Sequence, residues 1–268
     1  MKNTFGSDLS LTIFGESHGM AAGVPVDEAF LAACMDKRRA RGDGLSTPRV
    51  EGDAVQFLSG VVNGRTTGTA IALMIENQNT RSGDYVKTAD LLRPGHADYT
   101  AYAKYHGYQD ARGGGHFSGR VTAALVAGGA LVLGALNRAG IEIVTHIGRC
   151  AGISDAPFAL DDPAALAAQA EALLNKSEGF ALLDGSVEEP MKAAIRAAGA
   201  EGDSVGGVLE TAILGLPAGV GEPYFDSVES KLAHLAFSIP AVKGIEFGSG
   251  FGFADQKGSE ANDAFRMQ

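Results

Sequence analysis

Cysteines and basic residues are scarce in this sequence, and the two shortages exclude several classes of protein. Cys34 and Cys150 are its only cysteines and lie far apart, without the spacing of a metal or redox site. We therefore expect free thiols in a reducing cytoplasm. Lys and Arg number 22 against 32 Asp and Glu, a net charge of −10. This balance argues against general binding to nucleic acid, which depends on many phosphate contacts.

Long apolar runs are also missing from the pattern. No uninterrupted run reaches the roughly 18 residues that a membrane-spanning helix requires, so we expect no membrane association. Residues 1–14 show no basic flank followed by a sustained apolar segment, and we expect no secretory signal. Hydrophobic residues nevertheless make up 45% of the 268 positions, enough to bury a sizeable core.

The basic residues that are present gather in a few segments. One group lies between positions 37 and 49, and another lies within glycine- and histidine-containing motifs. An acidic protein that concentrates arginine in this way is suited to hold a small polyanion. For any one residue of positions 37–41, favourable termination of a helix is an equally simple explanation. The arginines concerned are Arg38, Arg39, Arg49, Arg93, Arg112 and Arg120.

Hydrophobic periodicity predicts an α+β fold with more antiparallel than parallel strands. Two β-rich runs joined through Asn63-Gly64 predict a hairpin. Capping signals predict helices that begin at Asp162-Pro163, at a Ser186–Glu189 capping box and at Asp226. The remaining expected elements are helices over 26–39 and 121–138, and strands over 141–147, 208–214 and 245–247.

The segment R-G-G-G-H-F-S-G-R, Arg112 to Arg120, is the most informative loop. Consecutive glycines leave main-chain N–H groups uncovered, and arginine, histidine and serine side chains place further donors around them. Such a set suits an anion that needs several hydrogen bonds at once, at the start of a helix. A glycine-rich turn that only links two elements is the alternative, and this loop alone does not separate the two.

Two other motifs display histidine. G-E-S-H-G, Gly15 to Gly19, presents His18 after a strand-like run, and R-P-G-H-A-D-Y displays Arg93 and His96 at a Pro-Gly turn. The first motif has the Gly-x-Ser-x-Gly outline of a serine hydrolase, but no further Ser–His–Asp arrangement accompanies it. A metal site at the two histidines lacks a third ligand. The other histidines of helical or strand segments are interpreted as packing or surface residues: His106, His146 and His234.

Seven motifs together resemble the chorismate synthase family, in order and over nearly the whole chain. They also suggest the family's α+β architecture, a single domain with mainly antiparallel sheets packed around helices in a β-α-β sandwich. The motifs are G-E-S-H-G, R-S-x-D-Y (Arg81 to Tyr85), R-P-G-H-A-D-Y, G-G-G-H-F-S-G-R, G-D-S-V-G-G (Gly202 to Gly207), G-E-P-Y-F-D (Gly221 to Asp226) and S-I-P-A-V-K-G (Ser238 to Gly244).

The resemblance implies a carbon–oxygen lyase of aromatic amino-acid biosynthesis, at the last step of the shikimate pathway. Phosphate leaves 5-enolpyruvylshikimate 3-phosphate by anti 1,4-elimination, giving chorismate. Reduced FMN (FMNH2) is required without net redox change, NADPH is a candidate reductant, and a homotetramer in the cytoplasm is implied. Clustered arginines suit this chemistry, because the substrate carries two carboxylates and a phosphate and the flavin carries another phosphate.

The motifs also carry residue roles over to this chain. His18 resembles the acid that protonates the departing phosphate, and His96 resembles the histidine that supplies a proton to the reduced flavin. No metal is implied. The substrate-binding set implied by the family is Arg38, Arg39, Arg49, Arg93 and Arg120, and the flavin-contacting set is His116, Phe117, Ser118, Pro240 and Ala241.

Two departures from the family pattern accompany these matches. Residues 20–25 lead almost directly into the first helix, where the family normally has a strand, and the chain reaches Gln268 before a further family segment. We expect one chorismate synthase-like domain over residues 1–268, C-terminally incomplete relative to the family. The alternative from another class is a truncated non-catalytic homologue that retains partial flavin or polyanion binding.

Overall fold

The computed structural model describes residues 4–6, 10–12, 24–40, 42–46, 52–77, 91–110, 112–177 and 179–262. It divides into two compact units, Met1–Leu216 and Pro217–Gln268, which we treat separately. Helices and strands are interspersed, and every strand pair between named strands of the described residues is antiparallel. The expected α+β class is thus confirmed.

The predicted Asn63-Gly64 hairpin is present in the first unit. Strand β3 (Val55–Ser59) pairs with β6 (Ala72–Ile75), and β4 (Val61–Val62) pairs with β5 (Arg65–Thr66) around the turn. Asn63 and Gly64 have φ of 49° and 69°, the left-handed pair that a tight hairpin turn requires. A separate short pair is formed by β1 (Thr4–Gly6) and β2 (Ser10–Thr12).

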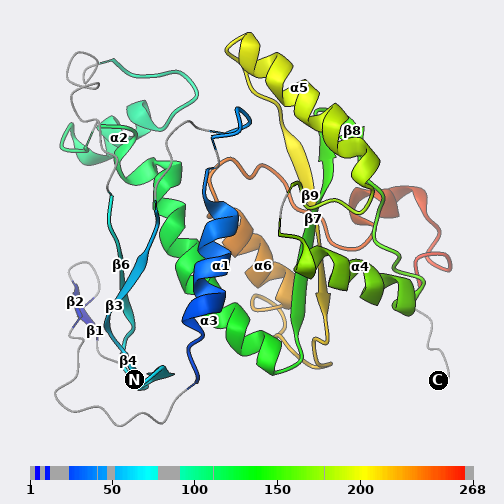
Figure 1. Ribbon diagram of the computed structural model, residues 1–268, viewed down its shortest axis with the longest axis horizontal. Helices are drawn as coiled ribbons and strands as arrows, with labels where there is room; N and C mark the ends of the chain where they lie inside the picture. Colours follow the sequence, from blue (N-terminus) through cyan, green and yellow to red (C-terminus); the bar gives the residue numbers. More distant parts are fainter. Residues whose placement is uncertain are drawn as a thin grey trace. The chain divides into compact units, whose positions relative to one another are not determined.

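Helices α1 (Glu28–Arg38) and α3 (Thr122–Arg138) pack along one another beside this hairpin (Figure 1). Asp27 caps α1 by accepting a hydrogen bond from the Phe30 N–H at 2.9 Å. Leu31 and Met35 of α1 are buried against the small side chains Ala123, Ala127 and Ala130 of α3. The hairpin contributes Val55, Phe57, Leu73 and Ile75 to the same core.

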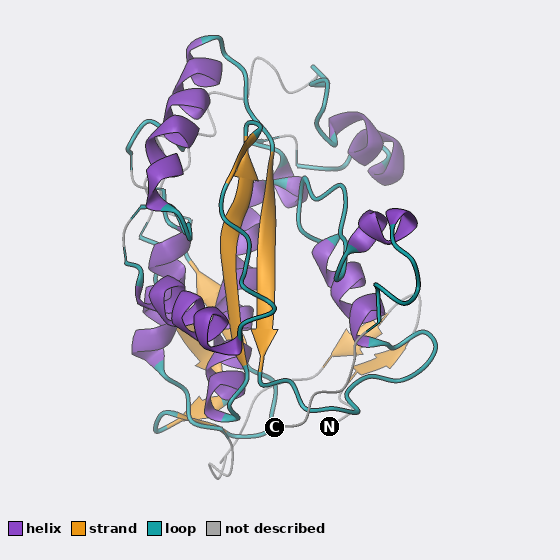
Figure 2. Ribbon diagram, turned by 90° about the vertical axis from the view of Figure 1, so that its right-hand side faces the viewer, coloured by secondary structure: helices purple, strands orange, loops and turns teal. Residues whose placement is uncertain are grey.

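A second core lies on a three-stranded sheet in the order β8-β7-β9 (Figure 2). The long strands β7 (Glu142–Cys150) and β9 (Gly207–Leu214) pair over most of their length, and β8 (Ile153–Ser154) turns back onto β7. Helix α4 (Pro163–Asn175) packs on β7, and Met191 of α5 (Glu188–Ala200) is buried near Cys150 and Leu182. Cys34 and Cys150 are both free thiols, as expected.

His146 is buried at the centre of this sheet, between two carboxylates. Its Nδ1 lies 2.8 Å from Asp155 Oδ2, and its Nε2 lies 2.8 Å from Oε2 of Glu210, the residue opposite it on β9. The Asp155 carboxylate also accepts hydrogen bonds from the main-chain N–H groups of Leu183 and Asp184. A doubly protonated ring can donate to both carboxylates, whereas a neutral ring can donate to only one. His146 therefore joins two strands and the 181–184 segment.

Several predicted element boundaries were wrong. The Ser186 capping box is not formed, because Asp184 caps a 3₁₀ turn (Gly185–Val187) ahead of α5 by accepting the Ser186 N–H. Ser227, rather than Asp226, caps α6 (Val228–Ala236). Residues 245–247 form no strand; they lead into a 3₁₀ helix, Gly250–Asp255. The helix that begins after Asp162 is confirmed, with the Asp162 side chain accepting from Ala164 and Ala165.

The expectation that no segment is long and apolar enough to span a membrane was also wrong. The stretch Gly119–Arg138, which contains α3, meets the criteria of length and composition with a hydropathy of 1.7. A single such helix is weak support for a membrane location, because core helices of globular proteins pass the same test. In this chain one side of α3 packs against α1, and 17% of the stretch is buried.

Candidate active site

The R-P-G-H-A-D-Y motif forms a turn that leads into helix α2 (Asp98–Tyr105). The Arg93 guanidinium donates to both carboxylate oxygens of Asp98, from Nε at 2.8 Å and from Nη2 at 3.0 Å, and the Arg93 main-chain N–H donates to the same carboxylate. The hydrogen bonds from the side chain and then the main chain of Arg93 lower the pKa of Asp98 to about 2. Asp98 stays ionised near neutral pH and fixes the direction of the Arg93 fork.

His96 lies exposed on the same turn, with one ring nitrogen engaged. Its Nδ1 is 3.1 Å from the main-chain oxygen of Pro94. Because a carbonyl oxygen only accepts, Nδ1 carries the proton in this contact. Nε2 is then the atom that could exchange a proton with a bound molecule.

The glycine-rich loop after Arg112 is folded by its own main chain. The Gly115 N–H donates to the Arg112 oxygen at 3.0 Å, so this glycine N–H is used within the loop and does not stand uncovered as predicted. Arg112 forms a fork with Asp110, from Nε at 2.8 Å to Oδ1 and from Nη2 at 2.8 Å to Oδ2. The hydrogen bonds from Arg112 lower the pKa of Asp110 to about 2.

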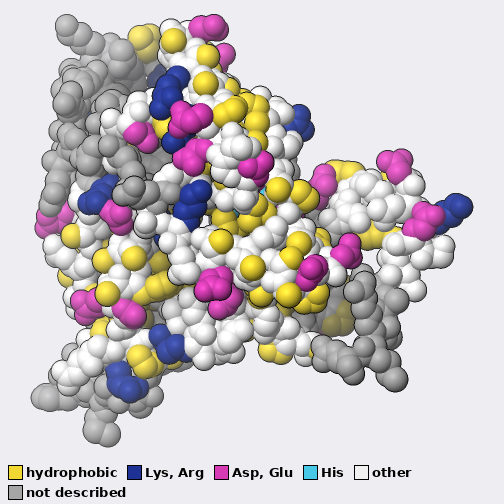
Figure 3. Space-filling view, turned by 45° about the vertical axis from the view of Figure 1, so that its right-hand side comes forward, with side chains coloured by type: hydrophobic (Ala, Val, Ile, Leu, Met, Phe, Trp, Pro, Cys, Tyr) yellow, Lys and Arg dark blue, Asp and Glu magenta, His cyan; other side chains and the backbone are white. Residues whose placement is uncertain are grey.

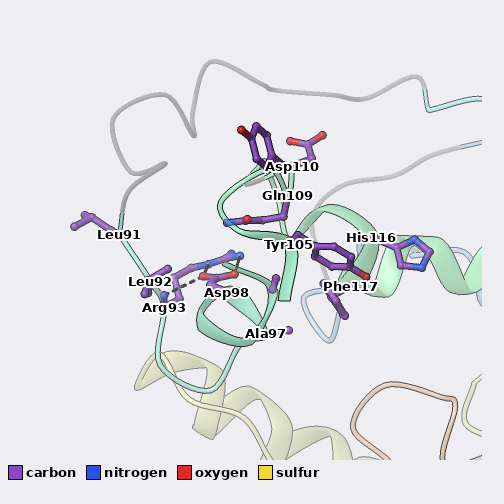
Figure 4. A pocket seen from close by; sticks show the side chains of 13 residues that line it. Leu91, Leu92, Arg93, Ala97, Asp98, Tyr105, Gln109, Asp110, His116 and Phe117 are labelled. Atoms are coloured by element: carbon purple, nitrogen blue, oxygen red, sulfur yellow. Dashed lines mark hydrogen bonds and ion pairs between the residues drawn. The ribbon is translucent and has the colours of Figure 1, made fainter. Parts of the chain in front are cut away.

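These two loops line one pocket of about 520 Å³ (Figure 4). Arg93 and Asp98 face each other on one side, while Phe117 and the Tyr105 ring, 6.4 Å apart between centroids, form an aromatic wall. A Cβ atom on Gly114 would lie 3.8 Å from Arg93 Nη2, so the glycine loop directly adjoins the arginine. The full lining comprises Leu91, Leu92, Arg93, Ala97, Asp98, Ala101, Tyr105, Tyr108, Gln109, Asp110, Gly114, His116 and Phe117.

Gly115→Ala should damage this loop, and Gly119→Ala should not. Gly115 has φ of 53°, and an added Cβ would collide with the main-chain oxygen of Asp110. We expect the substitution to lower the free energy of unfolding by about 1–3 kcal/mol. Gly119, four positions on, has open space for a Cβ and no left-handed φ, so its alanine variant should stay within about 0.5 kcal/mol.

Urea unfolding followed by far-ultraviolet circular dichroism measures both variants under identical conditions. Equal unfolding midpoints for the two variants would contradict the assigned loop geometry.

A second cluster joins two of the predicted arginines through one buried carboxylate. Asp53 Oδ2 accepts from Arg38 Nη1 at 2.8 Å, and Asp53 Oδ1 lies 2.6 Å from Arg120 Nη1, an ionic contact without hydrogen-bond alignment. The Asp53 side chain is 3% exposed, whereas those of Arg38 and Arg120 are 22% and 23% exposed. Arg38 lies in the last turn of α1 and Arg120 lies just before α3, so the two packed helices bring the guanidinium groups together.

The other predicted residues are distributed as follows. Ser118 accepts from the Arg120 main-chain N–H at 3.2 Å, and Arg39 pairs with Asp36 on the surface of α1. His18 and Arg49 lie outside the described residues, as do residues 20–23 of the expected gap. Pro240 and Ala241 belong to the second unit, at an exposed turn where Ala241 has φ of 70°.

Sequence reasoning missed the carboxylates that pair with the arginines. Asp98 stands within the R-P-G-H-A-D-Y motif and Asp110 stands two positions before Arg112, so local spacing could have indicated both. Asp53 has no local signal, because its partners come from other elements. On the described part of the face in Figure 3, basic side chains are scattered and often stand beside acidic ones.

Comparison with known proteins gives one consistent result. The family profile described as chorismate synthase matches residues 4–268. Chorismate synthases of Dehalococcoides mccartyi and Chitinophaga pinensis are 41% and 43% identical, and the alignments cover 100% and 98% of this chain and 74% and 70% of those proteins. A crystal structure of chorismate synthase superimposes with a TM-score of 0.71 and 28% identity, over 92% of this chain and 67% of that one.

The fold and these matches define an α+β enzyme of the lyase class, in aromatic amino-acid biosynthesis. More narrowly, the chain belongs to the chorismate synthase family.

Proposed function

We propose that this chain converts 5-enolpyruvylshikimate 3-phosphate to chorismate by anti 1,4-elimination of phosphate, as a carbon–oxygen lyase. The observation that carries the proposal is the family match across residues 4–268. The geometry supports it, since Arg38 and Arg120 converge on Asp53, and Arg93 shares a pocket with His116 and Phe117. A non-catalytic homologue is not favoured, because relatives that align with the whole chain are chorismate synthases.

The arginines would bind the anionic groups of the substrate. Guanidinium groups stay charged and offer paired donors to carboxylates and phosphates. Arg38 and Arg120 are each less than a quarter exposed, so interactions there are screened less than on an open surface. Arg39 and Arg49 complete the proposed substrate-binding set.

The histidines would move protons. His18 would protonate the departing phosphate. His96 would hand a proton from Nε2 to the flavin, because its Nδ1 is held by the Pro94 oxygen at 3.1 Å. No metal ion enters the proposal.

Reduced FMN fits the pocket by chemistry. Apolar and aromatic walls from Leu91, Tyr105 and Phe117 suit a flat ring system, and about 520 Å³ lies within the range of small-molecule sites. His116, Phe117 and Ser118 would hold the group, together with Pro240 and Ala241. Reduced flavin supplies the electron density that supports phosphate departure, while the protein orients the reactants and excludes water.

Further parts of the proposal rest on the family resemblance. They are a single family-type domain over residues 1–268, a homotetramer, a cytoplasmic location and NADPH as a source of electrons for the flavin. The free thiols Cys34 and Cys150 agree with a reducing compartment.

An anaerobic assay tests the function directly. The chain is mixed with chemically reduced FMN and 5-enolpyruvylshikimate 3-phosphate, and chorismate is followed by absorbance and identified by chromatography. We expect product with reduced FMN and none with oxidised FMN or without protein. Binding of reduced FMN by the folded chain, with no chorismate formed, would overturn the catalytic proposal in favour of the binding homologue.

A further inference from the structure

Asp53 and His146 are the two buried polar residues in the core of the described chain, and only the first adjoins predicted site residues. Asp53 precedes β3 and has φ of 49°, a left-handed conformation that Asp and Asn tolerate better than most residues. Its carboxylate is within 3 Å of two guanidinium groups, at 2.8 Å and 2.6 Å. No role in catalysis or binding has so far been given to this side chain.

The two arginines are held on more than one side. Arg38 Nη2 lies 3.3 Å from the Gly119 oxygen and 3.4 Å from Thr122 Oγ1, at the start of α3. Arg120 Nε lies 3.4 Å from Asn77 Oδ1 and its Nη2 lies 3.3 Å from the Glu76 oxygen, after β6. Asp53 contacts one nitrogen of each fork, and its contacts are the shortest in both sets.

Charge explains why a carboxylate is needed at this point. Two guanidinium groups next to one another repel, and the repulsion is strongest where solvent is excluded. One carboxylate between them offsets part of that repulsion, and two positive charges less one negative charge leave a net +1 for an incoming anion. An exposed acid would serve this purpose less well, because water and salt would screen it.

We propose that Asp53 is a positioning residue for the reaction, which fixes the guanidinium groups of Arg38 and Arg120 in the geometry that holds the anionic substrate. This inference rests on the proposed function. Asp53 acts through the two arginines and does not itself touch the substrate. Its loss affects the placement of the substrate more than the attraction between substrate and protein.

Asp53→Asn tests the inference with little change in shape. Asparagine tolerates the left-handed backbone and keeps one acceptor oxygen, but it loses the charge. We expect kcat to fall by about 10- to 100-fold, the size of effect that a lost charged hydrogen bond produces, while KM for the substrate changes less than about threefold. Asp203→Asn, an exposed carboxylate ahead of β9, is the matched control and should be unchanged.

A double-variant cycle separates positioning from a general structural role. If Asp53 acts through Arg120, adding Asp53→Asn to Arg120→Ala should lower kcat by less than about threefold beyond the single arginine variant. A full multiplicative loss in the double variant would overturn the inference, and so would Asp53→Asn activity within about twofold of wild type.

Phosphate binding distinguishes failure of this inference from failure of the proposed function. Inorganic phosphate should raise the melting temperature of the wild type, and Asp53→Asn and Arg120→Ala should both weaken that rise. A chain that forms no chorismate but keeps this pattern loses the proposed function and retains the role of Asp53. A rise that is unchanged in Asp53→Asn contradicts the role.

Should Asp53→Asn fail to fold, Arg38→Lys supplies the test. Lysine keeps the positive charge and leaves Asp53 paired with Arg120, but it replaces a planar fork by a single ammonium group. The inference requires a fall in kcat for this variant too, and activity within about twofold of wild type would overturn it.

Discussion

His146→Ala is expected to lower the free energy of unfolding by about 3–5 kcal/mol, because it removes the group buried between two carboxylates. The His146 side chain is 0% exposed, and so is that of Asp155. Asp155 would keep its hydrogen bonds from the Leu183 and Asp184 amides but would lose the ring that faces it. Since whole domains are stable by only about 5–15 kcal/mol, a loss of this size is a large share of the total.

Far-ultraviolet circular dichroism in urea is the suitable measurement, as the sequence contains no tryptophan. His234→Ala, an exposed histidine of α6, should change stability by less than about 0.5 kcal/mol. Glu210→Gln should cost less than His146→Ala, because the Glu210 side chain is 36% exposed and glutamine retains an acceptor oxygen. A His146→Ala midpoint close to that of wild type would contradict the interpretation of this cluster.

Acid should reveal the same cluster in a second way. Burial raises the pKa of Asp155, but hydrogen bonds from the Leu183 and Asp184 amides and from His146 outweigh it, so the pKa lies below its ordinary value. The unfolded chain takes up this proton near pH 3.9. The ionised carboxylate therefore stabilises the fold above about pH 4, and the contribution is lost as pH falls below that value. The stability difference between wild type and His146→Ala should narrow over this lower range.

His18→Ala should reduce kcat/KM by about 10²–10⁴-fold, the usual contribution of a positioned acid or base. The departing phosphate is a poorer leaving group without a proton donor, so the loss should fall on turnover and leave reduced FMN binding in place. The comparison is His106→Asn, an exposed histidine with φ of 53° at the end of α2, whose backbone asparagine can adopt.

Anaerobic turnover gives the rate for both histidine variants, and a flavin absorbance titration gives the affinity for reduced FMN. Near-normal turnover in His18→Ala would remove His18 from the reaction. Loss of flavin affinity along with turnover would mean that the residue holds the cofactor.

Features set by local chemistry were predictable from the sequence. Asn63-Gly64 indicated its hairpin because only a few residues accept two successive left-handed conformations, and Asp162-Pro163 indicated the start of α4. The Ser186 prediction failed because Asp184 stands two positions earlier and takes the capping role first. Residues 245–247 resemble a strand in composition, but no neighbouring strand pairs with them in the described chain.

The candidate site was predictable only in part. Arg38 and Arg120 were indicated by family motifs, and nothing local showed that they share a carboxylate. Arg38 and the Arg120 main-chain oxygen that it contacts are 82 positions apart, and Asp53 enters from a third segment. Such a cluster is created by the packing of α1 on α3 and becomes visible only when the helices are placed.

The alanines between α1 and α3 have a consequence for the distance between the two guanidinium groups. Ala127 is fully buried, and Leu31 and Met35 pack over it and its neighbours Ala123 and Ala130. Side chains no larger than a methyl group determine how closely the helix axes approach, and Arg38 and Arg120 sit at the facing ends of those helices. The spacing of the charges that would grip a substrate is thus governed by the smallest side chains in the core, well away from any charge.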